Sequence, residues 1–111
     1  MWAKPTKAFW DKLPKLYDTE KIPLEDKIVH GHFFMASCDW YIVEGDRETG
    51  EMFGWCCLGD PEMAEWGYVS FNELKDLKVR GFLEVDFDRH WTKRKVKDVK
   101  EITDRCRFLT P

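Results

Sequence analysis

The sequence lacks the residue patterns that identify most familiar enzymes. It contains no G-x-S-x-G nucleophile motif, no glycine-rich phosphate-binding loop and no dinucleotide-binding glycine pattern. Its cysteines form neither a C-x-x-C pair nor the doublet of doublets typical of zinc sites; they are Cys38, Cys56, Cys57 and Cys106. We therefore expect reduced, mostly buried thiols and no cofactor.

Long apolar runs are also missing. No stretch approaches the roughly 18 apolar residues that a membrane span requires, and the amino end has no apolar run of signal-peptide length. Internal repeats and low-complexity tracts are absent as well. The missing apolar runs predict a cytoplasmic protein that does not use a membrane as a partner.

The chain has the composition of a folded protein. Of its 111 residues, 43% are hydrophobic and 15% aromatic, which is too apolar for a disordered chain. This length suffices for one hydrophobic core and is too short for two. We expect a single domain over residues 1–111, with a basic carboxy-terminal segment over 92–111.

The amino-terminal part shows helical spacing and the centre shows strand spacing. Apolar residues between Lys7 and Leu16 recur at helical intervals, with Thr6 as a cap and Pro14 interrupting or ending the helix. Aromatic and β-branched residues then predict strands over Ile28–Met35, Trp40–Glu44, Met52–Leu58 and Trp66–Val69. The glycine-bracketed loop 45–50 suits an antiparallel connection.

A second helix and a last strand follow. Ser70-Phe71-Asn72-Glu73 has the form of a capping box, which predicts the start of a helix. Gly81 is expected to end this helix. Residues 82–88 alternate apolar and acidic side chains, as in a strand with one wet face. The sequence thus predicts an α+β fold: an antiparallel meander of about five strands, a short N-terminal helix, and a helix inserted before the last strand.

The net charge of −3 conceals two regions of opposite sign. Between residues 39 and 65, eight acidic residues stand against Arg47 alone, whereas residues 89–107 carry eight Lys or Arg and three acids. We expect the acidic surface to be the docking face for a partner, because charges of one sign speed encounter with an oppositely charged molecule. Its predicted binding residues are Asp46, Glu48, Glu51, Glu62 and Glu65, with Met63 and Trp66 as apolar anchors.

Four residues suggest an enzyme as the alternative to a binding protein. Glu44 and Asp46 are expected at the end of the second strand, and Asp88 and His90 at the end of the fifth. If their side chains converged, they would form the site of a small metal-dependent hydrolase or nucleotide-binding enzyme. Because surface carboxylates greatly outnumber metal ligands, the simpler interpretation is a solvated strand end without a metal.

Two histidines share a predicted strand face. His30 and His32 have a spacing seen in metal sites on strands, but the sequence shows no third ligand nearby. We therefore expect both imidazoles to be half-exposed and to have structural roles.

Nucleic-acid binding is a further possibility for the run 91–97, Trp-Thr-Lys-Arg-Lys-Val-Lys. It combines basic residues with an aromatic ring that is able to stack on a base. In a protein of net negative charge, such a short run more often forms a solvated surface. Direct nucleic-acid binding is therefore not the favoured interpretation.

Several blocks together resemble an uncharacterised family, a domain of unknown function found in small proteins of bacteriophages, conjugative plasmids and integrative elements. The most specific are the Trp-Tyr then Glu-Gly-Asp block and the Gly-Tyr then Ser-x-x-Glu-Leu block. The blocks that carry the resemblance are 13–17, His32-Phe33-Phe34, 39–46, Phe53-Gly54, 65–74 and 83–91. The sequence departs from the family pattern at Glu84, usually proline, and at Asp86-Phe87, usually Glu-Arg.

The resemblance implies a mobile-element setting, in which small acidic proteins often block host defence systems such as restriction or CRISPR effectors. Together with the missing reaction motifs, it favours a non-catalytic binding or accessory protein of the counter-defence kind, of the anti-restriction or anti-CRISPR type. Its partner would be a host protein or nucleoprotein complex that meets the acidic surface.

Overall fold

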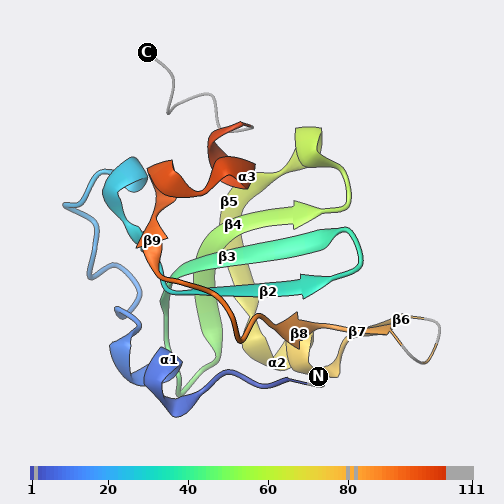
Figure 1. The fold of residues 1–111 in the computed structure, drawn as a ribbon. Helices are drawn as coiled ribbons and strands as arrows, with labels where there is room; N and C mark the ends of the chain where they lie inside the picture. Colours follow the sequence, from blue (N-terminus) through green and yellow to red (C-terminus); the bar gives the residue numbers. More distant parts are fainter. Residues whose placement is uncertain (2, 80, 82, 105–111) are drawn as a thin grey trace.

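A five-stranded antiparallel sheet forms the centre of the structure, with the strand order β5-β4-β3-β2-β8 (Figure 1). The structure, a computed structural model, describes residues 1, 3–79, 81 and 83–104. The strands of the central sheet are β2 (Gly31–Met35), β3 (Cys38–Gly45), β4 (Glu51–Leu58), β5 (Glu65–Ser70) and β8 (Asp86–Phe87). Strands β2 to β5 follow one another as a meander, and β8 is added beside β2.

Short elements surround this sheet in the described part of the chain. The helices are α1 (Lys7–Lys12), α2 (Phe71–Asp76) and α3 (Lys100–Thr103), and the 3-10 turns are η1 (Leu24–Asp26), η2 (Pro61–Met63) and η3 (Val96–Asp98). Two small antiparallel pairs join β1 (Ile28–Val29) with β9 (Arg94–Lys95), and β6 (Lys78–Val79) with β7 (Leu83–Glu84). The predicted α+β fold with a five-stranded antiparallel sheet is confirmed.

The strand boundaries differ from those predicted in two regions. The strand expected over 28–35 is divided into β1 and β2, and the strand expected over 82–88 contains β7 and β8 with buried Val85 between them. Beyond the strand expected to be last, the chain adds β9, η3 and α3. The rest of the predicted basic segment, residues 105–111 with Cys106, lies outside the described residues.

The first helix is shorter than predicted. Thr6 caps it as expected, since its hydroxyl accepts a hydrogen bond of 3.1 Å from the backbone N–H of Phe9. The helix ends at Lys12, and Leu13 already has an extended ψ of 123°. A residue before proline avoids the helical region, so Pro14 ends the helix instead of interrupting it later.

The second helix starts where predicted and ends earlier. The Ser70 hydroxyl accepts a hydrogen bond of 3.3 Å from the N–H of Glu73, as in one half of a capping box. The helix stops at Asp76, before β6 begins. Gly81, with φ +77°, lies between β6 and β7, so its left-handed backbone serves that connection and not the helix end.

Apolar side chains pack on both faces of the central sheet. The α1 cluster contains the buried residues Phe9, Leu13, Phe33, Met35, Trp40, Ile42, Met52, Leu74, Val85 and Phe87. The α3 cluster, on the opposite face, contains Val29, Tyr41, Val43, Trp55, Val96, Val99 and Ile102. Because successive strand residues point to opposite faces, the neighbours Trp40 and Tyr41 belong to different clusters. Both side chains are buried, whereas Tyr68 is 52% exposed.

Two paired glycines differ in the space around them. Gly54 on β4 lies opposite Gly67 on β5. A Cβ atom at Gly54 would collide with the backbone carbonyl of Tyr41 on the neighbouring strand, whereas a Cβ at Gly67 would meet nothing within 4 Å. The close approach of β3 and β4 therefore requires glycine at position 54.

This difference is testable by alanine substitution. We expect Gly54→Ala to lower the free energy of unfolding by about 1–3 kcal/mol, because the backbone of β3 must move. Gly67→Ala, the matched control, should change it by less than about 1 kcal/mol. Urea denaturation of both variants measures the two effects, and equal losses would contradict the packing described for Gly54.

Candidate functional site

The position of Glu44 depends on an irregularity in β3. Ile42 pairs with Gly54 and Glu44 pairs with Phe53, so Val43 is an extra residue, as in a β-bulge. Directly paired residues project from the same face of a sheet, and Phe53 packs against the α3 cluster. The bulge therefore turns Glu44 toward that face, and regular alternation would have aimed it into the α1 cluster.

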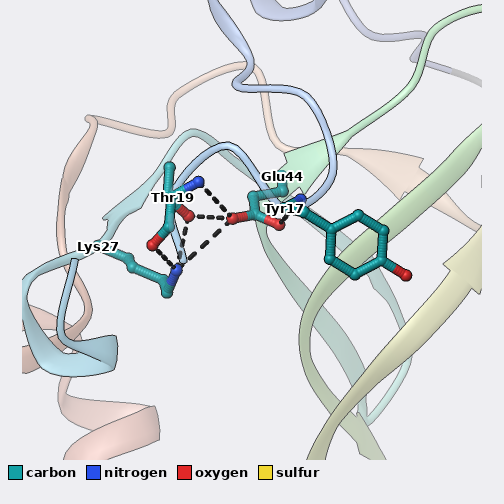
Figure 2. Close-up of polar contacts among 4 residues, drawn as sticks. All are labelled: Tyr17, Thr19, Lys27 and Glu44. Atoms are coloured by element: carbon teal, nitrogen blue, oxygen red, sulfur yellow. Dashed lines mark hydrogen bonds and ion pairs between the residues drawn. The ribbon is translucent and has the colours of Figure 1, made fainter. Parts of the chain in front are cut away.

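Glu44 is only 5% exposed, and both of its carboxylate oxygens are engaged (Figure 2). Oε1 accepts a hydrogen bond of 3.0 Å from the backbone N–H of Tyr17. Oε2 accepts hydrogen bonds from the Thr19 hydroxyl and, at 3.2 Å, from the Thr19 backbone N–H, and the Lys27 ammonium lies 3.5 Å away. Lys27 also donates to the Thr19 hydroxyl at 2.6 Å. One carboxylate thus ties the segment between α1 and η1 to the sheet.

The surroundings of Glu44 favour its charged form. Burial by itself would raise the pKa of this carboxyl, because a desolvated charge is unfavourable. The hydrogen bonds from Thr19 and Tyr17 and the positive charge of Lys27 outweigh burial and hold the pKa below its ordinary value. Glu44 is therefore a structural anion whose oxygens are already occupied, which does not suit a general acid or base.

Tyr17 has a strained backbone. Its φ of +71° lies in the left-handed region, which bulky residues rarely adopt. Such a conformation costs on the order of 1–3 kcal/mol and persists only where the surroundings hold it. Glu44 supplies that restraint by accepting the N–H groups of Tyr17 and Thr19. The side chain of Tyr17 consequently stands at the surface, 60% exposed.

A surface pocket of about 420 Å³ lies beside Tyr17. We call it the tyrosine pocket; its lining residues are Tyr17, Glu20, Ile22, Pro23, Leu24, Lys27, Glu44, Phe53 and Tyr68. The Tyr68 hydroxyl donates to the Tyr17 hydroxyl at 3.3 Å, and the ring of Tyr68 lies 5.1 Å from that of Phe53. The hydrogen bond with Tyr17 raises the pKa of Tyr68 to about 12, so this phenol is neutral at physiological pH.

A second hollow, of about 400 Å³, shares Tyr68 with the tyrosine pocket. Its lining includes the acidic residues Glu51 and Glu73. Tyr68 belongs to β5, the outermost strand on this side of the central sheet. An exposed tyrosine therefore separates two neighbouring hollows along a sheet edge.

The predicted acidic face is divided by the strand register. At the β3–β4 connection lie Asp46, Glu48 and Glu51, and at the β4–β5 connection lie Glu62, Met63 and Glu65. Glu51 pairs with Ser70, whereas Glu65 pairs with Cys56. At about 3.4 Å per residue, this places roughly 17 Å of strand between the two groups. They are two surfaces and not one.

The two predicted anchors differ in exposure. Met63 is 76% exposed. Trp66 is half-buried, stacks on Phe53 with ring centres 5.8 Å apart, and makes an edge contact with Trp55 at 5.4 Å. Trp66 therefore packs against the α3 cluster, whereas the rings of Tyr17 and Tyr68 are exposed.

The residues of the metal alternative each have separate partners. Glu44 is held by the segment before η1, and Asp46 accepts backbone N–H groups of its own loop. Asp88 lies 3.1 Å from His32 and accepts the backbone N–H of His90. In the part of the chain that the structure describes, no three His, Cys, Asp or Glu side chains are grouped as metal ligands. The convergence that this alternative requires is not found there.

The histidines lie in different environments. The ring of His32 lies between two carboxylates, with Nε2 2.7 Å from Asp39 and Nδ1 3.1 Å from Asp88, and it stacks on Tyr41 at 4.5 Å. His32 thus connects β2, β3 and the segment after β8, which is a structural arrangement, while His30 lies beside α1.

The basic run considered for nucleic-acid binding is largely engaged within the protein. The indole N–H of Trp91 donates to a carbonyl oxygen of β1 at 2.9 Å, and the Arg94 guanidinium lies over its ring at 4.1 Å. Lys95 and Lys97 pair with Asp26 at 3.9 and 3.2 Å. Trp91 is therefore not a free platform for a base.

Sequence reasoning missed the meeting of Tyr17, Phe53 and Tyr68. Tyr17 and Tyr68 both lie in blocks that carry the family resemblance, but their spacing along the chain does not indicate contact. Comparisons of the chain with protein-family models, curated proteins and solved structures found no match. Among the described residues, no helix has the length and apolar character that crossing a membrane requires.

The role of Glu44 is testable by substitution with glutamine. We expect Glu44→Gln to lower the free energy of unfolding by about 1–3 kcal/mol at neutral pH, because hydrogen bonds to a charged group are lost. The folded-state pKa of Glu44 is depressed, so its contribution is present above the unfolded pKa of about 4.3 and is lost as the pH falls through the folded value. Urea denaturation of both proteins across this pH range measures the difference.

Glu51→Gln is the matched control, since Glu51 is exposed. It should change stability by no more than about 0.5 kcal/mol. If the deficit of Glu44→Gln stayed constant down to strongly acidic pH, the charge of Glu44 would not be the stabilising feature.

Proposed function

We propose that this protein is a non-catalytic binding protein that captures a basic, extended segment of a partner protein at the tyrosine pocket. The observation that carries the proposal is the position of Tyr17. A buried carboxylate holds this residue in a strained conformation while its ring remains 60% exposed. Strained residues cluster at binding and catalytic sites, and the ring of Tyr17 lies at the surface beside that of Tyr68, with ring centres 6.5 Å apart.

The charges around the pocket favour a basic occupant. Glu20 lines the tyrosine pocket, and Glu51 and Glu73 line the hollow beyond Tyr68. Lys27 is the one cation that lines either hollow within the described residues, and Glu44 and Thr19 engage it. Lys and Arg of a partner would meet these acids, and their cationic groups would also be attracted to the exposed tyrosine faces.

The sheet edge favours an extended occupant. Within the described residues, β5 pairs with β4 on one side only. The outer backbone groups of such a strand are able to pair with a strand of another chain, while side-chain pockets give specificity. Tyr68 would lie between alternate side chains of the added segment.

The sequence resemblance supports a setting for this activity. In a mobile genetic element, the partner would be a cytoplasmic host protein or nucleoprotein complex, and capture of its basic segment would block a defence system of the restriction or CRISPR kind. Of the predicted binding residues, Glu51 lies at the proposed site, and Asp46 and Glu48 belong to the adjacent hairpin.

A displayed library of random short peptides tests the proposal. We expect selected peptides to be enriched in Lys and Arg and to bind less tightly as salt increases. Tyr17→Ala and Tyr68→Ala should each weaken binding by tenfold or more, since truncating a binding tyrosine typically costs at least about 2 kcal/mol. Titration with a labelled selected peptide measures these affinities.

Two charge reversals distinguish binding at the tyrosine pocket from binding at the acidic group of Glu62 and Glu65. Glu51→Lys should slow association, whereas Glu62→Lys, at the opposite end of β4, should leave it unchanged. Leu58→Ala removes a side chain that is 68% exposed and serves as the apolar control. Selection of acidic peptides, or loss of binding in Glu62→Lys but not in Tyr68→Ala, would contradict the proposal.

A further inference from the structure

A separate cavity of about 200 Å³ lies between α1 and the segment that joins β8 to β9. We call it the His30 cavity, because His30 forms part of its wall. Figure 1 shows this joining segment, in orange, passing between β2 and α1 on its way to β9. The cavity is thus lined from three regions that are distant in the sequence.

Most of the charged residues in the wall of the His30 cavity are cations. Lys12 of α1 lines it together with Arg89 and Lys93 of the joining segment. Unlike Lys95 and Lys97, which pair with Asp26, these three side chains form no ion pair with any residue that the structure describes. They therefore place three uncompensated positive charges around one small space.

A single carboxylate, that of Asp88, lies in the same wall. Its Oδ2 lies 3.1 Å from Nδ1 of His32, and its Oδ1 accepts the backbone N–H of His90 at 3.0 Å. Among the residues that the structure describes, the ion pair of Asp88 is with His32 and not with the three cations. The lining as a whole retains an excess of positive charge.

His30 lies in a partly buried and positively charged environment. Burial of the ring and the charge of Lys93 lower the pKa of His30 to about 4. The ring is therefore neutral at physiological pH, and its Nδ1 atom is buried without a hydrogen-bond partner among the described residues. An anion in the cavity would offset the effect of Lys93 and favour protonation of the imidazole.

We propose that the His30 cavity binds a small phosphate-bearing anion, either inorganic phosphate or the phosphate group of a small monoester. Lys12, Arg89 and Lys93 would donate charge-assisted hydrogen bonds to its oxygens, with Arg89 able to bind two of them at once. The hydroxyl proton of Thr6, in the same lining, is a further donor.

The size and surroundings of the cavity favour a small anion over a nucleic-acid strand. Its volume of about 200 Å³ is below the roughly 300 Å³ at which pockets for drug-sized ligands begin. A nucleic-acid strand also needs a track of cations for successive phosphates. Here the next basic residues are engaged, Arg94 by the Trp91 ring and Lys95 and Lys97 by Asp26.

Titration with inorganic phosphate, followed by NMR, tests the proposal. We expect saturable one-to-one changes at the His30 ring, and a rise in the pKa of His30 from about 4 toward its ordinary value of about 6.5. Chloride at equal ionic strength should produce neither effect. A parallel titration with adenosine monophosphate distinguishes the two sources: tighter binding than phosphate assigns the site to a monoester, and equal binding assigns it to the free anion.

A pair of double variants provides the matched control. Lys12→Gln with Arg89→Gln should weaken phosphate binding by about tenfold or more, because hydrogen bonds to a charged ligand are lost. Lys95→Gln with Lys97→Gln makes the same change in net charge outside the cavity and should leave binding unchanged. Equal losses in both double variants, an effect of phosphate no larger than that of chloride, or binding of a single-stranded oligonucleotide without binding of phosphate would each overturn the proposal.

Discussion

The Glu44 carboxylate joins the end of β3 to the segment between α1 and η1. Its oxygens accept the backbone N–H groups of Tyr17 and Thr19, and Lys27 neutralises it from the other side. Removing one partner of such a buried group leaves the other charges uncompensated, which is costly in a poorly solvated site. The geometry of this segment, the strained backbone of Tyr17 and one wall of the tyrosine pocket all depend on this carboxylate.

Two groups of opposite charge lie near the two edges of the central sheet. Acidic Glu51 and Glu73 lie by Tyr68 on β5, whereas Arg89 lies by Phe87 of β8 at the far edge. Opposite fields at opposite edges allow one small protein to carry two recognition surfaces of different sign. The proposed peptide site and the proposed anion site therefore do not compete for the same charges.

Local sequence patterns predicted most of the fold. Strand alternation and the Ser70–Glu73 cap located the meander and α2, and Pro14 marked the limit of α1 within a few residues. The site was not predictable in the same way. A bulge at Val43 decides which face Glu44 takes, and it arises from the pairing of two strands and not from local propensity. Without that register, Glu44 was interpreted as a candidate metal ligand.

Amide hydrogen exchange at Tyr17 and Thr19 tests the central claim most directly. If the Glu44 carboxylate holds this segment, both amides exchange slowly at neutral pH in the wild-type protein and much faster in Glu44→Gln, while the amides of β3 remain protected in both. Rapid exchange at Tyr17 and Thr19 in the wild-type protein, or equal protection in the variant, would contradict the claim that Glu44 positions Tyr17.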